Sequence, residues 1–364
     1  MGNGGTIEQQ FRMGNDTDSW NMFMERYLYL EPEIALEVST AGKYCTRMLR
    51  DMGFSVHMAD PVKLSLIFNT SKKNDKEDSY KLAKLLRLGE LPEVHLPSKE
   101  ADDLRSIVRY RKSLGDAVTE IKNRVHAVLG RYGISIDATD IFGKRGLSEI
   151  ERSSEKMSAS DRIIVSDMIE RIRELKDRES TMEDEIARMC HERNDVKLLM
   201  TIPGINVYSA AAIVSEIDDV SRFESKEKLA SYAGLVPKQD QSGGTDYRGH
   251  ITKHGPSMIR FILVNAAHHI IKYSGRMKKK YLSIVRRVGM KRAIVAVARK
   301  LLEIIWTMLS RGVEFVDHVD ALTEKKMKAM SARASKPRQT KELKDTVKLI
   351  REDRLKGVSK ELFS

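Results

Sequence analysis

Cysteine is nearly absent from this sequence, and long apolar runs are missing altogether. The only two cysteines among the 364 residues, Cys45 and Cys190, lie far apart and in no CxxC pair. That spacing excludes a disulfide scaffold and a zinc finger. No run approaches the roughly 20 apolar residues that a membrane span requires, and no basic leader followed by a short apolar stretch opens the chain. We therefore expect a cytoplasmic protein with no membrane partner.

Acidic residues are scarce in the C-terminal third. Residues 238–300 hold fifteen Lys and Arg against two Asp, and residues 324–364 hold thirteen basic against six acidic residues. Together these segments exceed the net charge of +12 of the whole chain, so the remainder is acidic on balance. Such asymmetry predicts a polyanion partner for the C-terminal third. A solvated charged surface is the alternative in both segments.

The first part of the chain has an α/β pattern. A length of 364 residues predicts two or three domains, because single cores rarely grow past roughly 250 to 300 residues. Short strands are predicted over residues 5–13, 33–38 and 54–58, with a helix over residues 43–52. A further helix is expected to begin at Asn74 and to stop at Gly89. Pro92 and Pro97 then predict a boundary that closes a first domain, residues 1–97.

A long arm is predicted next, over residues 98–197. Sparse apolar stripes over residues 98–131 and 158–193 predict two long helices that pair as an antiparallel coiled coil. A glycine-containing loop near residues 132–157 would join them. Because such arms often mediate self-association, we expect a homodimer or homotetramer. Short apolar helices over residues 198–316 and a basic, partly disordered tail over residues 317–364 complete the expected organisation.

Three carboxylates occupy positions that suit a metal site. Glu37 ends an apolar strand, and Asp75 and Asp78 lie one turn apart at the start of a helix. Such groups can converge at a sheet edge, and their oxygens are the ligands that Mg²⁺ or Mn²⁺ prefers. Two such ions would serve phosphoryl transfer. The alternative is ordinary capping, because Asn74 is a good N-cap and acidic first-turn residues favour the helix dipole.

A tight turn formed by Pro203, Gly204 and Ile205 separates two apolar helices. Helix-hairpin-helix turns of this kind direct backbone N–H groups at a nucleic-acid phosphate. The turn lacks the second glycine of the strongest examples, so a plain connection between two helices is the alternative. His268 and His269 are neighbours on a predicted helix and face different directions. We expect them to serve core packing or phosphate contact rather than a shared metal.

A serine followed by two glycines, Ser242-Gly243-Gly244, is predicted to lie in a flexible loop. Its surroundings suit a hydroxyl that attacks a phosphodiester, because basic residues flank it. An ordinary loop is the alternative, since serine and glycine are common in loops. The basic residues predicted to contact nucleic acid, together with Gly243 and Gly244, are Lys238, Arg248, Lys253, Lys278, Lys279, Lys280, Lys291 and Arg292.

The order of these segments resembles a known family. The runs "ALEVST", "KKNDKEDSYKLAKLLRLGELPEV", "IPGI", "LASYAGLVPKQDQSGGTDYRGHITKHG" and "KRAIVAVARKLLEIIWTML" are similar to those of pilin-invertase-like, DEDD-type transposases of insertion sequences. The resemblance covers the chain up to about residue 316. It implies an α/β RNase H-like (RuvC-like) domain, a coiled-coil arm and an all-α C-terminal transposase domain. Glu37, Asp75 and Asp78 would then bind metal, and Ser242 would be the nucleophile.

Two positions depart from the family pattern. Gln241 stands where many members have a second serine, which leaves Ser242 as the nucleophile. The family's first metal-binding aspartate lies on an opening strand, and Asp16 and Asp18, in a polar turn, do not match it. We therefore expect an RNase H-like domain that lacks its first strand, because of an internal start or a decayed element. The chain as given should bind nucleic acid while cleaving slowly or not at all.

The resemblance predicts a nucleoid-associated DNA recombinase of an insertion sequence. DNA, both element ends and target, is the expected partner, and in several members a non-coding bridge RNA pairs with donor and target. Two alternatives stay open. One is a truncated, non-catalytic transposase that only binds nucleic acid. The other is a metal nuclease like a Holliday-junction resolvase, which forms no covalent intermediate.

Overall fold

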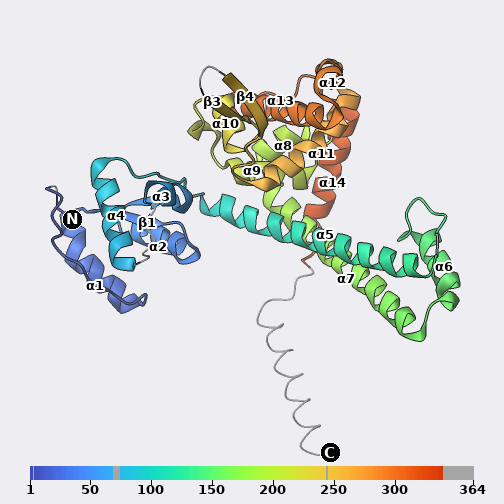
Figure 1. Cartoon of the computed structure of the whole chain (residues 1–364), viewed down its shortest axis with the longest axis horizontal. Helices are drawn as coiled ribbons and strands as arrows, with labels where there is room; N and C mark the ends of the chain where they lie inside the picture. Colours follow the sequence, from blue (N-terminus) through green and yellow to red (C-terminus); the bar gives the residue numbers. More distant parts are fainter. Residues whose placement is uncertain (3, 69–73, 243–244, 339–364) are drawn as a thin grey trace, which may run out of the picture. The chain divides into compact units, whose positions relative to one another are not determined.

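The computed structural model describes residues 1–2, 4–68, 74–242 and 245–338, and within residues 239–248 and at residue 40 it describes only the backbone. The fold is mostly helical with two small sheets (Figure 1). The chain divides into two compact units, Met1–Pro97 and Ser98–Ser364. Among the described residues, no helix is both long and apolar enough to cross a membrane.

The first unit is built on a β-α-β arrangement. Its elements are α1 (Thr17–Tyr27), β1 (Glu33–Glu37), α2 (Thr40–Asp51), β2 (Ser55–Ala59), α3 (Pro61–Ile67) and α4 (Asp75–Leu88). Strands β1 and β2 pair in parallel, with Glu37 opposite Ala59. The strand predicted over residues 5–13 is wrong, since this polar segment is irregular and the described sheet contains only β1 and β2. An RNase H-like sheet therefore stays a prediction.

Helix α4 begins and ends at the two capping residues from which the sequence predicted its bounds. The Asn74 side chain accepts a hydrogen bond from the Lys76 N–H, and Gly89 ends the helix with a φ of +67°, a left-handed conformation that favours glycine. Leu82, Leu85 and Leu86 pack in a cluster with Ala35 of β1 and Ala59 of β2. This packing places the acidic first turn of α4 beside β1.

Two long antiparallel helices begin the second unit. Helix α5 (Lys99–Arg131) pairs with α7 (Ala159–Cys190), since Arg111 bridges to Glu179 and Glu183 while Arg131 reaches Asp161 at 2.9 Å. The predicted connecting loop is wrong in part. It contains α6 (Lys144–Ser153) and the 3₁₀ turn η2 (Ser154–Lys156), which cover a small apolar core. Interlocking of side chains as in a coiled coil stays a prediction.

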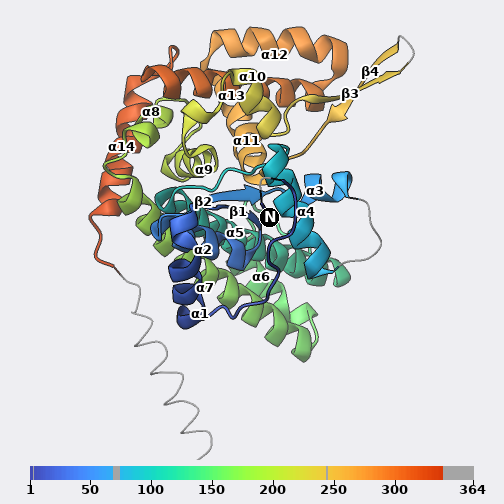
Figure 2. The same cartoon turned by 90° about the vertical axis from the view of Figure 1, so that its left-hand side faces the viewer.

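The rest of the second unit is mostly helical. Its elements are α8 (Asn194–Met200), α9 (Val207–Ile217), η3 (Val220–Arg222), α10 (Lys226–Tyr232), β3 (Pro237–Ser242), β4 (Thr245–Ile251), α11 (Ser257–Tyr273), α12 (Gly275–Val288), α13 (Met290–Arg311) and α14 (Asp320–Ala334). The predicted helical domain is confirmed, but it is not all-α, because β3 and β4 form an antiparallel hairpin that projects from the helices (Figure 2). Leu104 of α5 and Ile186 of α7 belong to the same core as α13, so no packing boundary falls at residue 197.

Helix α14 lies within the segment predicted to be a partly disordered tail. It packs against α7 and α8, and Met330 is buried in the main core. The prediction is therefore wrong for Asp320–Ala334. Residues 339–364 of the predicted tail lie outside the described residues.

Candidate functional site

The three predicted metal-binding carboxylates line one cavity in the first unit. Glu37 stands at the end of β1, and Asp75 and Asp78 lie in the first turn of α4. The cavity has a volume of about 320 Å³, and its walls include Ala35 and Leu82. Strand pairing and the packing of α4 on β1 therefore bring together residues that are about forty positions apart in the sequence.

Both aspartates of this cavity contact cationic side chains. An Asp75 carboxylate oxygen lies 3.5 Å from Arg12 Nη2, and Asp78 lies 3.2 Å from Lys81 Nζ. Among the described residues, no group of three or more His, Cys, Asp or Glu side chains is close enough together to hold a metal ion. The donor set nevertheless consists of carboxylate oxygens alone, the ligand type that hard divalent cations prefer. The three residues thus match such a cation in chemistry and share one cavity, but their carboxylates do not stand close enough in this structure to hold one ion together.

Other aspartates near the sheet serve as helix caps. Asp16 caps α1, and hydrogen bonds from the backbone and side chain of Ser19 hold the pKa of that carboxyl below its usual value. Asp18 follows in the first turn of α1, and Asp60 caps α3 by accepting from the backbone of Val62 and Lys63. None of these three aspartates lines the cavity. They do not complete the set of Glu37, Asp75 and Asp78.

Ser242 is the last residue of strand β3, at the tip of the hairpin. It pairs in register with Thr245 of β4, so the prediction of a flexible loop is wrong for Ser242 itself. Gly243 and Gly244 lie outside the described residues. Two glycines between two strand-like runs are a typical hairpin signal, which could have revealed this element from the sequence. The structure therefore presents the backbone of Ser242 at the end of a projecting two-stranded ribbon (Figure 2).

Arg260 of α11 holds the base of this hairpin to the helices. Its Nη1 donates to the backbone oxygens of Ala233, His254 and Gly255 at distances of 2.9 to 3.1 Å. These acceptors lie on both sides of the hairpin, just before β3 and just after β4. Burial lowers the pKa of the Arg260 guanidinium. One side chain thus fixes where both strands leave the helical core.

The predicted nucleic-acid contacts gather on and around α12. From Tyr247 to Leu302 the sequence contains no Asp or Glu. Seven exposed basic residues of this acid-free segment lie on α12 and at the start of α13, and we call them the α12 basic face: Lys278, Lys279, Lys280, Arg286, Arg287, Lys291 and Arg292. Within the described residues none of them forms an ion pair. Lys238 and Lys253, at the hairpin, are also exposed, and Arg248 lies in β4.

The predicted phosphate-binding turn points its side chains inward. Pro203 and Ile205 are buried, and only Gly204 is exposed. Gly204 has a φ of +88°, and a Cβ there would lie 2.5 Å from the Cβ of His269 on α11. The glycine is therefore needed for close packing against α11. Side-chain contacts from Pro203 and Ile205 to nucleic acid are excluded, which leaves the backbone of the turn as its only possible contact.

Lys326 of α14 supports this turn from within. Its Nζ donates to the backbone oxygens of Met200, Ile202 and Ile205, the last two at 2.9 and 3.1 Å. Burial lowers the pKa of Lys326 to about 8. Sequence reasoning missed this residue, because its partners lie more than 120 positions away. His268 and His269 are both exposed, so the expected core packing is wrong for them.

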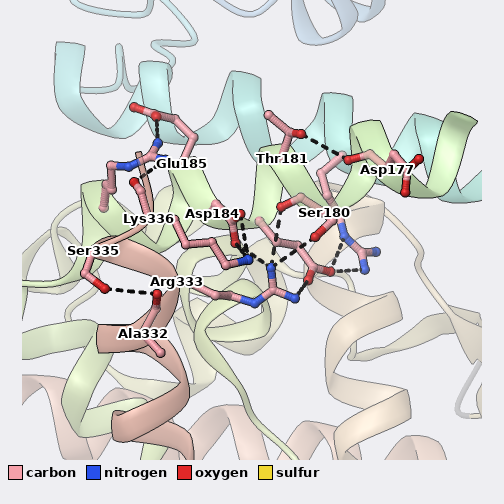
Figure 3. Close-up of polar contacts among 12 residues, drawn as sticks. Asp177, Ser180, Thr181, Asp184, Glu185, Ala332, Arg333, Ser335 and Lys336 are labelled. Atoms are coloured by element: carbon pink, nitrogen blue, oxygen red, sulfur yellow. Dashed lines mark hydrogen bonds and ion pairs between the residues drawn. The ribbon is translucent and has the colours of Figure 1, made fainter. Parts of the chain in front are cut away.

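The described basic residues at the end of α14 are engaged by acids of α7 (Figure 3). Arg333 and Lys336 reach Asp184 at 2.6 and 3.0 Å, and Arg338 reaches Glu185 at 2.9 Å. Arg333 also contacts Glu183 at 2.8 Å. The positive charge that predicted a nucleic-acid-binding tail is therefore largely neutralised within the protein over residues 333–338. The α12 basic face is the larger unpaired positive surface of the described chain.

Comparisons with known proteins match both units. The family model DEDD_Tnp_IS110, described as a transposase, matches residues 1–134, and the model described as the transposase IS116/IS110/IS902 family matches residues 196–282. A probable family 20 transposase of Pseudomonas aeruginosa is 28% identical over 293 residues, covering 76% of this chain and 84% of that protein. The transposase for insertion sequence element IS1111A of Coxiella burnetii is 24% identical over 290 residues, covering 76% and 78%. A pilin gene-inverting protein of Moraxella bovis is 34% identical over 123 residues, covering 32% of this chain and 38% of that protein.

Proposed function

Because this chain belongs to the family of IS110/IS116 transposases, both of whose domains it carries, we propose that it cleaves and rejoins the DNA of an insertion sequence. The observation that carries the proposal is the shared cavity of Glu37, Asp75 and Asp78. It is supported by a serine at the tip of a hairpin that stands in the same unit as an acid-free basic surface.

Glu37, Asp75 and Asp78 would hold a divalent cation, Mg²⁺ or Mn²⁺. When bound, such an ion stabilises the charge that develops on a phosphodiester during cleavage. The carboxylates themselves are kept at the cavity by β1 and the first turn of α4. In this structure, ion pairs with Arg12 and Lys81 offset the negative charges of the two aspartates. The contact between Arg12 and Asp75 is exposed, so it costs little to exchange for another cation, whereas Lys81 is more buried beside Asp78.

Ser242 is proposed as the nucleophile. Its hydroxyl oxygen would attack a phosphorus atom of DNA, a serine–phosphate bond would form, and the bond from phosphorus to the 3′ oxygen would break. The serine proton would pass to the released 3′ oxygen, which becomes a 3′ hydroxyl. Because a phosphodiester replaces a phosphodiester, a 3′ hydroxyl of another strand can reverse the step and reseal the DNA without an external energy source. The position of Ser242 at the tip of the hairpin supports this role.

The α12 basic face is proposed to hold the phosphate backbone. Its exposed cations have no acidic neighbours along more than fifty residues of sequence, so a polyanion is the complementary partner. The partner would be the DNA of the element ends and the target, and a bridge RNA is the candidate guide. The backbone of Gly204 and the hairpin lysines Lys238 and Lys253 would extend this surface.

Self-association through the arm formed by α5 and α7 is part of the proposal. Ile163 and Ile164 of α7 are exposed, the former to 70%, although apolar side chains of this size usually pack. A second copy of the chain could cover them. Replacing both by serine should lower the mass measured by light scattering. An unchanged mass would remove this part of the proposal.

A denaturing gel separates the proposed recombinase from its alternatives. Incubated with Mn²⁺ and a duplex carrying an end of the element that encodes it, the protein should form a covalent adduct with DNA. A metal nuclease of the junction-resolvase type would cut without an adduct. A protein that only binds nucleic acid would retard the duplex in a native gel and leave it intact. This is the outcome that the absence of the family's first aspartate predicts, and the adduct assay separates it from the proposed cleavage.

A further inference from the structure

A second cavity lies in the other unit, beside the α12 basic face. Its volume is about 370 Å³, within the range of small-molecule sites in proteins. Its walls are the start of α12, one side of α13 and the segment that follows α13. The residues that line it and carry the argument below are Arg276, Met277, Lys280, Thr307, Val313 and Val316. Neither the proposed cleavage site nor the turn at Gly204 includes any of them.

The mouth of this cavity exposes apolar side chains. Val313 is 46% exposed and Val316 is 72% exposed, whereas Phe315 between them is buried in the core. Met277 and Met308 form buried apolar parts of the wall. Methionine is deformable and suits surfaces that receive a flat apolar group. The cavity therefore favours a ligand with an apolar body.

The cations on the α12 side of the rim favour a phosphate group on that ligand. The acids that line the cavity already have partners, since Asp317 accepts from the Ser274 hydroxyl and Glu314 lies 3.8 Å from His318. Lys300 lies 3.2 Å from Glu303. Arg276 and Lys280 remain, exposed on α12 and in no ion pair within the described residues. Arg276 and Lys280 therefore put two cations on the α12 side of the mouth, while Glu314 and Asp317 keep their negative charges on the segment that follows α13.

We propose that this cavity receives an unstacked base of the nucleic-acid strand that lies along α12. The inference rests on the proposed function, because it requires a strand on the α12 basic face. Lys280 belongs both to that face and to the cavity wall, so a phosphate held there places its own nucleotide at the mouth. Bases extruded from a stack are bound between apolar side chains, and each such contact contributes measurably to affinity.

The test compares two single strands that differ only in their bases. A thymidine oligonucleotide and an oligonucleotide of abasic residues have the same phosphates. Wild-type protein should bind the thymidine strand about tenfold more tightly, the effect of stacking roughly one base. Val313→Trp and Thr307→Phe fill the cavity from opposite walls. Each should abolish this preference and leave the affinity for the abasic strand unchanged.

Leu66→Trp is the matched control, since it adds an aromatic ring at an exposed position of α3 in the other unit. It should keep the tenfold preference. Equal binding of both strands by the wild type, or a preference that survives both filling variants, would overturn the inference. A different result would show that the α12 basic face does not bind nucleic acid at all. In that case the abasic strand would bind without dependence on salt, and alanine at Lys278 and Lys279 would change nothing.

Discussion

Arg333 of α14 donates a hydrogen bond of 2.6 Å to the carboxylate of Asp184 in α7, although 149 residues separate the two in the sequence (Figure 3). Asp184 is only 8% exposed, and Lys336 approaches the same carboxylate at 3.0 Å. This contact ties the last described helix to the base of the α5–α7 arm. It also explains why the basic side chains within residues 333–338 are not free to bind a polyanion.

Asp184→Asn should destabilise the second unit. The change keeps the size of the side chain and removes the charge that Arg333 and Lys336 share, so we expect a loss of about 1–3 kcal/mol in the free energy of unfolding. Chemical denaturation would measure it. Glu170→Gln is the control, because Glu170 pairs with Arg173 on the exposed side of α7 and such pairs contribute about 0–1 kcal/mol. Equal losses in the two variants would contradict the prediction.

The same carboxylate predicts a response to acid. Burial acts to raise the pKa of Asp184, but hydrogen bonds from Lys336 and Arg333 outweigh it and hold that pKa below its ordinary value of 3.8. The stabilisation is therefore complete above pH 3.8 and is lost as the pH falls through the lower value in the folded state. Wild-type stability should fall in this range more steeply than that of Asp184→Asn. Parallel curves would argue against the prediction.

Lys326 predicts a response at alkaline pH. Burial lowers its pKa from 10.5 to about 8 in the folded protein. Between these values the unfolded chain holds a proton that the folded chain has released, so wild-type stability should rise with pH from about 8 to about 10.5. Lys326→Met should lack this rise. The test is to measure the denaturation midpoint of both proteins as a function of pH across this range. Identical dependence of the two midpoints on pH would refute the prediction.

Removing charge from the α12 basic face should weaken nucleic-acid binding at every sequence. Lys278→Ala and Lys279→Ala should each reduce the slope of log affinity against log salt by about 0.9 for each lost contact with duplex phosphate. Lys328→Ala on α14 is the control, since it removes the same charge from a residue paired with Glu324. If the control lowered the slope as much as the variants do, the surface would be wrongly placed.

Asp78→Asn should weaken metal binding in the first unit. The change removes one proposed ligand and keeps the fold of α4. Residues that only orient a metal ligand typically change metal affinity by about tenfold or more, so loss of a ligand itself should lower the Mn²⁺ affinity by more than about tenfold. Calorimetric titration of Mn²⁺ measures it. Glu77→Gln, in the same helical turn but outside the cavity wall, should bind Mn²⁺ as the wild type does. Loss of binding in that control would assign the effect to the helix instead.

Local signals in the sequence predicted the elements whose causes are local. Asn74 and Gly89 marked both ends of α4, and the apolar run before Glu37 marked β1, so the carboxylates could be placed on their elements. Their shared cavity follows from the pairing of β1 with β2 and the packing of α4. The sequence could supply the positions but not the ion pairs that Arg12 and Lys81 make with them.

Features with distant causes were not predictable. In the sequence, Lys326 and Arg333 are simply two cations of a basic tail. Their partners lie more than 120 residues away: backbone oxygens bind Lys326, and acids of α7 bind Arg333. The burial of the Ile205 side chain was not predictable either, because a Pro-Gly-Ile sequence does not reveal which side of the turn faces the core. The hairpin around Ser242 could have been predicted from the sequence, since Gly243 and Gly244 separate two strand-like runs.

The most direct measurement is the formation of a covalent protein–DNA adduct by the wild type and by Ser242→Ala. With Mn²⁺ and a labelled duplex of an element end, the wild type should give an adduct that survives denaturation and leaves a free 3′ hydroxyl. Ser242→Ala should give none, while native-gel retardation of the same duplex stays within about twofold of wild type, because binding depends on the α12 basic face. An adduct that survives Ser242→Ala, or robust cleavage of the duplex without any adduct, would contradict the assignment of Ser242 as the nucleophile.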